Sequence, residues 1–245
     1  MDGKSKDQLR DAAGRRAGSD WAWPARSLLG SLGAPARTRL LALGALRQYP
    51  PDRVLIRELD QTGFVLILLD GVVKATARAQ DGRAALLAIR MGGDLVGEVA
   101  AVDGQPRSAT VTSCGTVVAR VVSRAEFLDC MRREPQIAHA VSGSVVAKFR
   151  EASARQVDYA GSDVPTRLAR VLFHIAMTYG ERAGNVVNIR WPITQPELAT
   201  LAGAGEPTVH KALRQLRDAG VVSTGYRSIT INDVARLRSL AYPDD

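Results

Sequence analysis

The amino-acid sequence predicts an α+β fold in which a β-rich region precedes two helical regions. Two observations support this prediction. Between residues 54 and 122, short runs of apolar and β-branched residues alternate with turn-forming dipeptides, a spacing typical of an antiparallel barrel or roll. From residue 135 to about residue 160 the chain has almost no helix-breaking residues, so a long helix is expected. The turn dipeptides are Asp70-Gly71, Asp81-Gly82, Gly92-Gly93 and Asp103-Gly104.

The elements expected before the long helix follow from local patterns. Residues 1–25 are polar and mixed in charge, with few large apolar side chains, so a flexible N-terminal tail is expected there. Apolar residues recur at helical spacing over residues 28–43, and Pro50-Pro51 ends that pattern. The expected strands span residues 54–57, 64–69, 72–78, 84–89 and 110–122.

Composition excludes several classes of protein. The 245 residues, 46% of them hydrophobic, suffice for the core of one large domain or two modest ones. The two cysteines, Cys114 and Cys130, lack the paired spacing of a zinc or iron-sulfur site, so a reduced, cytoplasmic setting is expected. Neither a signal-peptide pattern nor a run of about 18 apolar residues is found, so we expect neither export nor a membrane span.

The net charge of +8 favours a polyanionic partner, but the distribution of charge does not locate its binding site. Residues 1–54 hold ten basic and five acidic side chains, whereas residues 162–245 hold ten basic and eight acidic ones. Because the excess lies near the N-terminus, evidence for nucleic-acid binding has to come from motifs.

Residues 96–109, with the sequence VGEVAAVDGQPRSA, suit a phosphate and a ribose. The Arg107 guanidinium can donate to two phosphate oxygens, and the Ser108 hydroxyl and nearby backbone amides supply further donors. The Glu98 carboxylate can accept from a sugar hydroxyl. These are the requirements of a cyclic nucleotide. The candidate ligand-binding residues in this segment are Gly97, Glu98, Val99, Arg107, Ser108 and Ala109.

Residues 195–212, with the sequence QPELATLAGAGEPTVHKA, combine two helical patterns with a Gly-Ala-Gly turn between them, which is typical of a helix-turn-helix. Ala199 is small where the two helices meet, Gly203 suits the turn, and Gly205 is the expected N-cap of the second helix. Pro207 lies in the first turn of that helix, where it costs no hydrogen bond. The residues expected to join the two helices are Leu198, Val209 and Leu213.

The outward positions of the second helix are candidates for reading DNA. Lys211 and Arg214 are natural partners for guanine or phosphate in a major groove. Residues 221–224 and 228–231 predict two strands around a tight turn, the wing of a winged helix, and Arg227 in that turn is a candidate phosphate contact. The candidate DNA-binding residues are Thr194, Glu206, Thr208, His210, Lys211, Arg214 and Arg227.

With these motifs, residues 26–235 resemble the Crp-Fnr family of bacterial transcription regulators. The resemblance implies a cyclic-nucleotide-binding β-roll, of the double-stranded β-helix or jelly-roll type, over residues 26–134. It also implies a dimerisation helix over residues 135–161 and a winged helix-turn-helix DNA-binding domain over residues 162–245. A hinge is expected near Gly161, with Ser162 or Asp163 as the N-cap of the next helix.

The resemblance also implies roles for the ligand-binding residues. Glu98 would bind the ribose 2′-hydroxyl, Arg107 and Ser108 the cyclic phosphate, and Gly97 would make a backbone contact. The positions that recognise the adenine in cyclic-AMP receptors fall on Ala152 and Ser153, and Ala152 replaces the expected threonine. The resemblance makes cyclic AMP the first candidate ligand, and the missing threonine hydroxyl at Ala152 keeps cyclic GMP and a cyclic dinucleotide as alternatives.

The recognition helix also departs from the family pattern, because Glu206 and Pro207 stand where the best-known catabolite regulators have Arg-Glu. The operator is therefore not expected to be the familiar one. The iron-sulfur branch of the family uses a cysteine cluster, and the haem-sensing branch uses axial ligands. Neither pattern is found in this sequence, so no metal, haem or iron-sulfur cofactor is expected.

The expected function is a homodimeric, sequence-specific DNA-binding regulator that is controlled by a cyclic nucleotide. Its expected partners are a near-palindromic duplex DNA, a second copy of the chain and RNA polymerase, without a membrane. A ligand-independent regulator, or a small-molecule sensor acting through protein partners, is the alternative. An enzyme is not expected, because no nucleophile-base pair accompanies Glu98 and Arg107.

Overall fold

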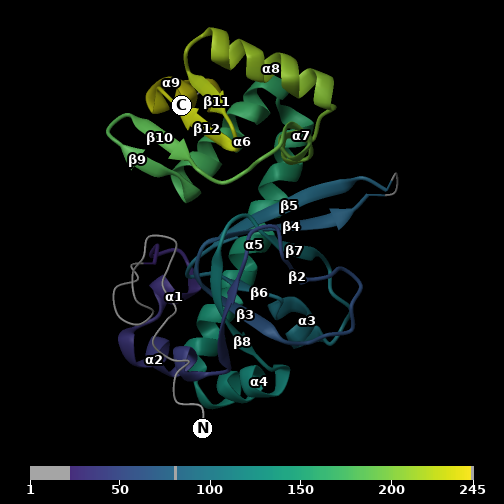
Figure 1. Ribbon diagram of the computed structural model, residues 1–245, viewed down its shortest axis with the longest axis vertical. Coiled ribbons are helices and arrows are strands. Elements are labelled where there is room, and N and C mark those ends of the chain that lie inside the picture. Colours follow the sequence, from purple (N-terminus) through teal and green to yellow (C-terminus); the bar gives the residue numbers. More distant parts are fainter. Residues whose placement is uncertain (1–22, 80–81, 244–245) are drawn as a thin grey trace. The chain divides into compact units, whose positions relative to one another are not determined.

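A computed structural model describes residues 23–79 and 82–243 of the chain (Figure 1). The chain forms two compact units. The first contains residues up to Ala77 together with Ala88–Phe149, and the second contains Arg78–Leu87 and residues from Arg150 onward. The expected tail at residues 1–22 lies outside the described residues. Trp23, the first described residue, donates from Nε1 to the backbone oxygen of Leu69 over 2.9 Å.

The first eight strands form an antiparallel roll of two four-stranded sheets, with strand orders β1-β8-β3-β6 and β2-β7-β4-β5. The roll lies in the first unit, apart from Arg78 of β4 and residues 84–87 of β5. The predicted α+β fold class is confirmed. The strands are β1 (Ala45–Tyr49), β2 (Val54–Ile56), β3 (Val65–Asp70), β4 (Val72–Arg78), β5 (Ala84–Met91), β6 (Leu95–Val96), β7 (Thr110–Ser113) and β8 (Val117–Val122). The helices are α1 (Leu28–Ser31), α2 (Ala34–Ala42), α3 (Glu98–Asp103), α4 (Arg124–Arg133) and α5 (Pro135–Gly161), the last of which ends in the second unit.

Strand β3 is apolar over residues 65–69 because both of its faces are covered there. Val65 and Ile67 pack in a core with residues of α1, α2, α4 and α5, whereas Leu66 and Leu68 pack in a second core with residues of the other sheet. Alternate residues of a strand point to opposite faces, so a run of consecutive apolar residues is expected for such a central strand.

Three sequence expectations for the roll are corrected. The helix expected over residues 28–43 is two helices, because Gly33 takes an extended conformation as the N-cap of α2. Strand β1 lies in a segment for which no strand was predicted. The strand expected over residues 110–122 is two strands, β7 and β8, which belong to different sheets. The amide of Cys114 donates to Val72, and the chain then crosses from one sheet to the other.

The second unit contains the last part of α5, four further helices and a four-stranded sheet of order β11-β12-β10-β9. Helix α6 packs against α7, α8 and α9. Asp163 caps α6 by accepting from the amide of Thr166 over 2.9 Å, as expected for one of the two candidate caps. Strands β9 and β10 were not predicted. The elements are α6 (Val164–Tyr179), β9 (Glu181–Ala183), β10 (Val186–Ile189), α7 (Gln195–Ala202), α8 (Glu206–Asp218), β11 (Val222–Gly225), β12 (Ser228–Ile231) and α9 (Val234–Ala241).

None of the helices in the described part of the chain combines the length and the apolar composition that a membrane span requires.

Candidate functional site

The candidate ligand-binding segment of the roll, residues 97–109, is called the cassette below. It begins at Gly97, which is the N-cap of α3 and has a φ of +86°. This left-handed conformation favours glycine. A Cβ atom at Gly97 would lie 2.7 Å from Arg107 Nη1 and 3.0 Å from Ile56 Cδ1, so the site has no space for a side chain. Glycine therefore allows the backbone to approach the Arg107 guanidinium closely.

Arg107 is 2% exposed, and its guanidinium is bound within the protein. Nε donates to Thr62 Oγ1 over 3.1 Å, Nη1 to the Gly97 oxygen over 2.8 Å, and Nη2 to the Phe64 oxygen over 2.6 Å. The guanidinium carbon also lies 4.7 Å from the centre of the Phe64 ring. Burial lowers the pKa of Arg107 from its ordinary value, while the nearby Asp60 and Glu98 act in the opposite direction. In this arrangement three of the donors expected to bind a phosphate have protein acceptors.

Glu98 is held by a lysine of the long helix. Lys148 Nζ donates to Glu98 Oε1 over 2.8 Å and to the Leu95 oxygen over 2.6 Å. The Glu98 side chain is 4% exposed and that of Lys148 is 22% exposed, so the ion pair is largely removed from water. Lys148 was missed by sequence reasoning. The only signal was that it is the one lysine of the predicted long helix.

The structure thus brings together Gly97 and Glu98, from the start of the cassette, and Arg107, from near its end. Val99 and Ser108 are exposed, and Ala109 is half-buried. Ser153 is half-buried on the part of α5 that belongs to the second unit.

The helix-turn-helix is formed by α7 and α8. Thr194 caps α7 in a reciprocal arrangement, in which its Oγ1 accepts from the Glu197 amide and Glu197 Oε2 accepts from the Thr194 amide. Helix α7 ends at Gly203, whose φ is +58°, and Gly205 is the N-cap of α8. The Thr194 hydroxyl therefore has a structural partner in addition to its expected role at DNA.

Helix α8 has one buried face and one exposed face. Four of the five predicted contact positions on it are exposed, and the fifth, His210, is half-buried. The exposed four are Glu206, Thr208, Lys211 and Arg214. The buried residues are Val209, Ala212, Leu213 and Leu216, so the helix presents polar and charged groups on the side away from its core.

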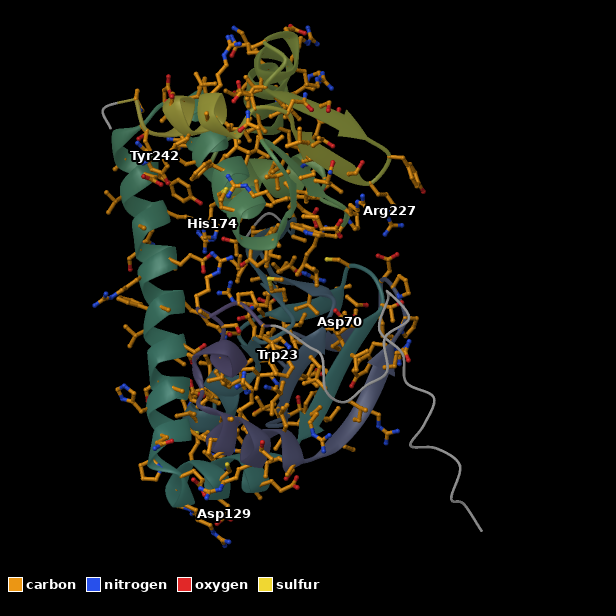
Figure 2. The ribbon with its side chains drawn as sticks, turned by 90° about the vertical axis from the view of Figure 1, so that its left-hand side faces the viewer. Trp23, Asp70, Asp129, His174, Arg227 and Tyr242 are labelled. Carbon is orange, nitrogen blue, oxygen red and sulfur yellow. The ribbon has the colours of Figure 1, made fainter. Side chains whose placement is uncertain are left out.

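Strands β11 and β12 form the predicted wing. Gly225 pairs with Ser228, which leaves Tyr226 and Arg227 as the two residues of the turn. Both are exposed, and Arg227 has a φ of +55°, an uncommon conformation for a residue with a side chain. Figure 2 marks Arg227 near the tip of this hairpin. Tyr226, an exposed aromatic residue beside a cation, was not among the predicted site residues.

Comparisons with known proteins agree with both parts of this description. Residues 46–134 match the model of the cyclic nucleotide-binding domain, and residues 166–240 match the Crp-like helix-turn-helix domain. The chain is similar to a CRP-like cAMP-activated global transcriptional regulator of Mycobacterium tuberculosis, with 29% identity over 77% of this chain and 84% of the relative. It is 26% identical to a cyclic AMP receptor protein of Thermus thermophilus, over 80% of this chain and 88% of that protein.

Two solved structures share the fold. A CRP-family transcriptional regulator from Thermus thermophilus has a TM-score of 0.67 at 21% identity, covering 80% of this chain and 96% of that one. A c-di-GMP responsive global regulator from Xanthomonas campestris has a TM-score of 0.69 at 19% identity, covering 81% and 99%.

A nucleotide-binding roll joined to a winged helix-turn-helix defines a DNA-binding transcription regulator with a sensory domain. The order of the two matched domains and the named relatives specify this class further. The chain belongs to the Crp-Fnr family.

Proposed function

We propose that the protein is a homodimeric regulator whose affinity for a near-palindromic DNA site is controlled by a cyclic nucleotide bound in the roll. The observation that supports this most is the placement of Gly97, Glu98 and Arg107 in one site of the roll, in a chain that also carries an exposed recognition helix. Cyclic AMP is the first candidate ligand, because the named relatives include cyclic-AMP-activated regulators.

A second copy of the chain is the proposed partner of α5. Val145, Val146 and Phe149 are exposed on the first part of this helix, and Phe149 is 71% exposed. Apolar side chains at this spacing form a face that another helix would cover. Such a dimer would present two α8 helices to half-sites about one helical turn, roughly 34 Å, apart.

DNA is the proposed partner of α8 and the wing. Lys211 and Arg214 are exposed on α8, and Arg227 lies in the wing turn. The helix is suited to base edges in a major groove, and the wing to a phosphate of the backbone.

RNA polymerase is a further proposed partner and the cytoplasm the proposed location, as expected for a transcription regulator. We propose that the protein has no catalytic activity. A cyclic nucleotide incubated with the protein should therefore remain unhydrolysed.

A regulator that needs no nucleotide is a second candidate, and one observation favours it. Arg107 is bound to Thr62, Gly97 and Phe64, and Glu98 is bound to Lys148, so the site residues already have partners. A ligand would have to exchange some of these interactions. Its binding free energy would be reduced by the cost of that exchange.

Calorimetric titration of the full chain separates the two candidates. The titrants are cyclic AMP, cyclic GMP and cyclic di-GMP, and the variants are Arg107→Lys and Arg120→Lys. Arg120 is a matched control, because it is another arginine of the roll whose guanidinium donates to backbone oxygens, those of Leu43 and Gly44. Nucleotide binding that is lost in Arg107→Lys and kept in Arg120→Lys would support the first candidate. Absence of binding to the wild type would favour the second.

A sensor that acts only through protein partners predicts a different result with DNA. Fluorescence anisotropy with a duplex selected from a random library, and with a random duplex of equal length, tests this possibility. Regulators of this type bind specific sites about 10³-fold or more tightly than random DNA. Equal affinity for the two duplexes at moderate salt would contradict the proposed function.

A further inference from the structure

The C-terminal end of α7 is held by side chains that no part of the predicted site includes. The last carbonyl groups of a helix have no amide partner within the helix and need other donors. In α7 the Ala199 oxygen accepts from the Ala204 amide, and the Thr200 oxygen accepts from the Gly203 amide. The next three carbonyl groups, of residues 201–203, accept from side chains of α5 and α6.

Two residues supply these donors. The Tyr159 hydroxyl lies 3.1 Å from the Leu201 oxygen and 3.3 Å from the Thr200 oxygen. Arg167 donates from Nε to the Ala202 oxygen over 2.8 Å and from Nη2 to the Gly203 oxygen over 3.1 Å. A cation at the C-terminal end of a helix also interacts favourably with the helix dipole. Tyr159 and Arg167 thus form a cap on α7 that comes from outside the helix-turn-helix.

The cap is itself anchored. Arg167 Nη1 donates to the Tyr159 oxygen over 3.0 Å and to the Ser162 oxygen over 2.9 Å, so one guanidinium joins the end of α5 to the end of α7. The guanidinium carbon lies 5.7 Å from the centre of the Tyr159 ring. Burial raises the pKa of Tyr159 above its ordinary value, so the phenol remains a protonated donor at neutral pH.

The Tyr159 ring packs directly on the turn between the two helices. A Cβ atom at Gly203 would lie 2.6 Å from Cδ1 and Cε1 of this ring. The φ of Gly203 is +58°, which sets the direction in which the chain leaves α7. The ring therefore covers the residue at which the path toward α8 is determined.

We propose that Tyr159 and Arg167 are positioning residues of the DNA-reading surface, which fix the end of α7 and thereby the orientation of α8. The inference rests on the proposed function, because it assigns these residues to the same DNA-reading surface. Neither residue is proposed to touch DNA. Their effect is expected in the discrimination between DNA sequences, which depends on the placement of side chains to within fractions of an ångström.

Arg170 provides a matched control on the same helix. It lies three residues after Arg167 and also holds the end of α5, because Nη1 donates to Asp158 Oδ1 over 2.6 Å and to Ser162 Oγ over 2.8 Å. Its Nε donates to the Ala241 oxygen, and its guanidinium lies 5.5 Å from the ring of Tyr242, which is labelled in Figure 2. Arg170 therefore joins α5 to the end of α9 and not to α7.

The test uses the full chain and the variants Tyr159→Phe, Arg167→Gln and Arg170→Gln. Fluorescence anisotropy measures the affinity of each for a duplex selected by the wild type and for a random duplex, as a function of salt. Tyr159→Phe and Arg167→Gln should lower the ratio of the two affinities at least tenfold, and Arg170→Gln less than threefold. The salt dependence of random binding should not change, whereas loss of a direct phosphate contact would reduce its slope by about one.

Amide hydrogen exchange without DNA is the second measurement. The amides of Gly203 and Ala204 should exchange faster in Tyr159→Phe and Arg167→Gln than in Arg170→Gln. Three results would overturn this inference and leave the proposed function standing. They are a sequence preference kept by Arg167→Gln, a weaker salt dependence of its binding to random DNA, and unchanged hydrogen exchange at these amides. A wild type with no preference for any selected duplex would overturn the proposed function, and the inference with it.

Discussion

Lys148 Nζ lies 2.8 Å from Glu98 Oε1, and so an ion pair joins the long helix to the carboxylate that is expected to bind a ribose. Lys148 also donates to the Leu95 oxygen just before the cassette. Both partners lie in the first unit, so this link is a property of the roll itself. A ligand hydroxyl that reaches Glu98 would share the carboxylate with Lys148 or displace it.

Removing only the lysine should destabilise the roll. Lys148→Met leaves the Glu98 carboxylate, which is 4% exposed, without its cation. Breaking a buried pair on one side typically costs several kcal/mol, and the partial exposure of Lys148 reduces the expected loss to about 2 kcal/mol. Urea unfolding at neutral pH measures this loss. The double variant Glu98→Gln with Lys148→Met should recover most of it, and a double variant no more stable than Lys148→Met would contradict the account.

Removing one hydrogen-bond acceptor of the Arg107 guanidinium should strengthen nucleotide binding. Thr62 is exposed, and its hydroxyl accepts from Arg107 Nε over 3.1 Å. Thr62→Val removes this acceptor and leaves the donor available to a phosphate, so the calorimetric affinity for the bound nucleotide should rise about fivefold, equivalent to about 1 kcal/mol. Thr110→Val is the control, because Thr110 Oγ1 accepts from the Glu58 amide, whereas Arg107 Nε donates to Thr62. Weaker binding by Thr62→Val would show that Arg107 keeps its present partners when the ligand binds.

A charge on α5 should separate the proposed dimer. Phe149 is 71% exposed, and burial of an aspartate at this position in a helix pair would carry a large desolvation cost. Sedimentation analysis should therefore show that Phe149→Asp is a monomer at concentrations where the wild type is a dimer. Leu59→Asp is the control, since Leu59 is 75% exposed in the roll and lies outside α5. If wild type and Phe149→Asp sediment with the same molecular mass, the exposed apolar face of α5 is not the dimer interface.

The cap of α6 should give a pH-dependent contribution to stability. Hydrogen bonds from Thr166 lower the pKa of Asp163 below its ordinary value. Because the folded pKa lies below the unfolded one, which is about 3.9, the contribution is complete above the unfolded pKa and is lost as the pH falls through the folded value. Asp163→Ala should lower the free energy of unfolding by about 1 kcal/mol at pH 7 and by less at pH 3.

Asp163→Asn is the control for this measurement, because asparagine keeps the acceptor and does not titrate. The free-energy difference between Asp163→Asn and Asp163→Ala should be similar at the two pH values. A difference between wild type and Asp163→Ala that does not change with pH would show that the cap does not depend on the charge.

The helix-turn-helix was predictable because its signals are local. Gly203, Gly205 and Pro207 mark the turn and the start of α8 within a few positions, and the structure ends and begins the helices there. The division of residues 110–122 into β7 and β8 was not predictable in this way. The same apolar and β-branched residue types continue on both sides of the crossing, and its one glycine, Gly115, would also fit a bulge within a single strand. Pairing of β7 with β4 and of β8 with β3 separates the two strands.

The partners of the site residues could not be predicted from the sequence either. Lys148 is 50 positions from Glu98, and Thr62 is 45 positions from Arg107. Tyr159 and Arg167 meet the end of α7 from two other helices. Motif spacing identifies residues that can bind a ligand, but it does not show which groups of the protein compete for the same atoms.

The most direct test of the central claim is fluorescence anisotropy of the wild-type protein with its selected duplex, with and without saturating cyclic AMP. The proposed control of DNA binding predicts a change in affinity of about 5- to 150-fold, and calorimetry should find the same factor in the affinity for cyclic AMP when DNA is present, because coupling is reciprocal. Equal DNA affinities with and without cyclic AMP, cyclic GMP or cyclic di-GMP would contradict nucleotide control of this protein.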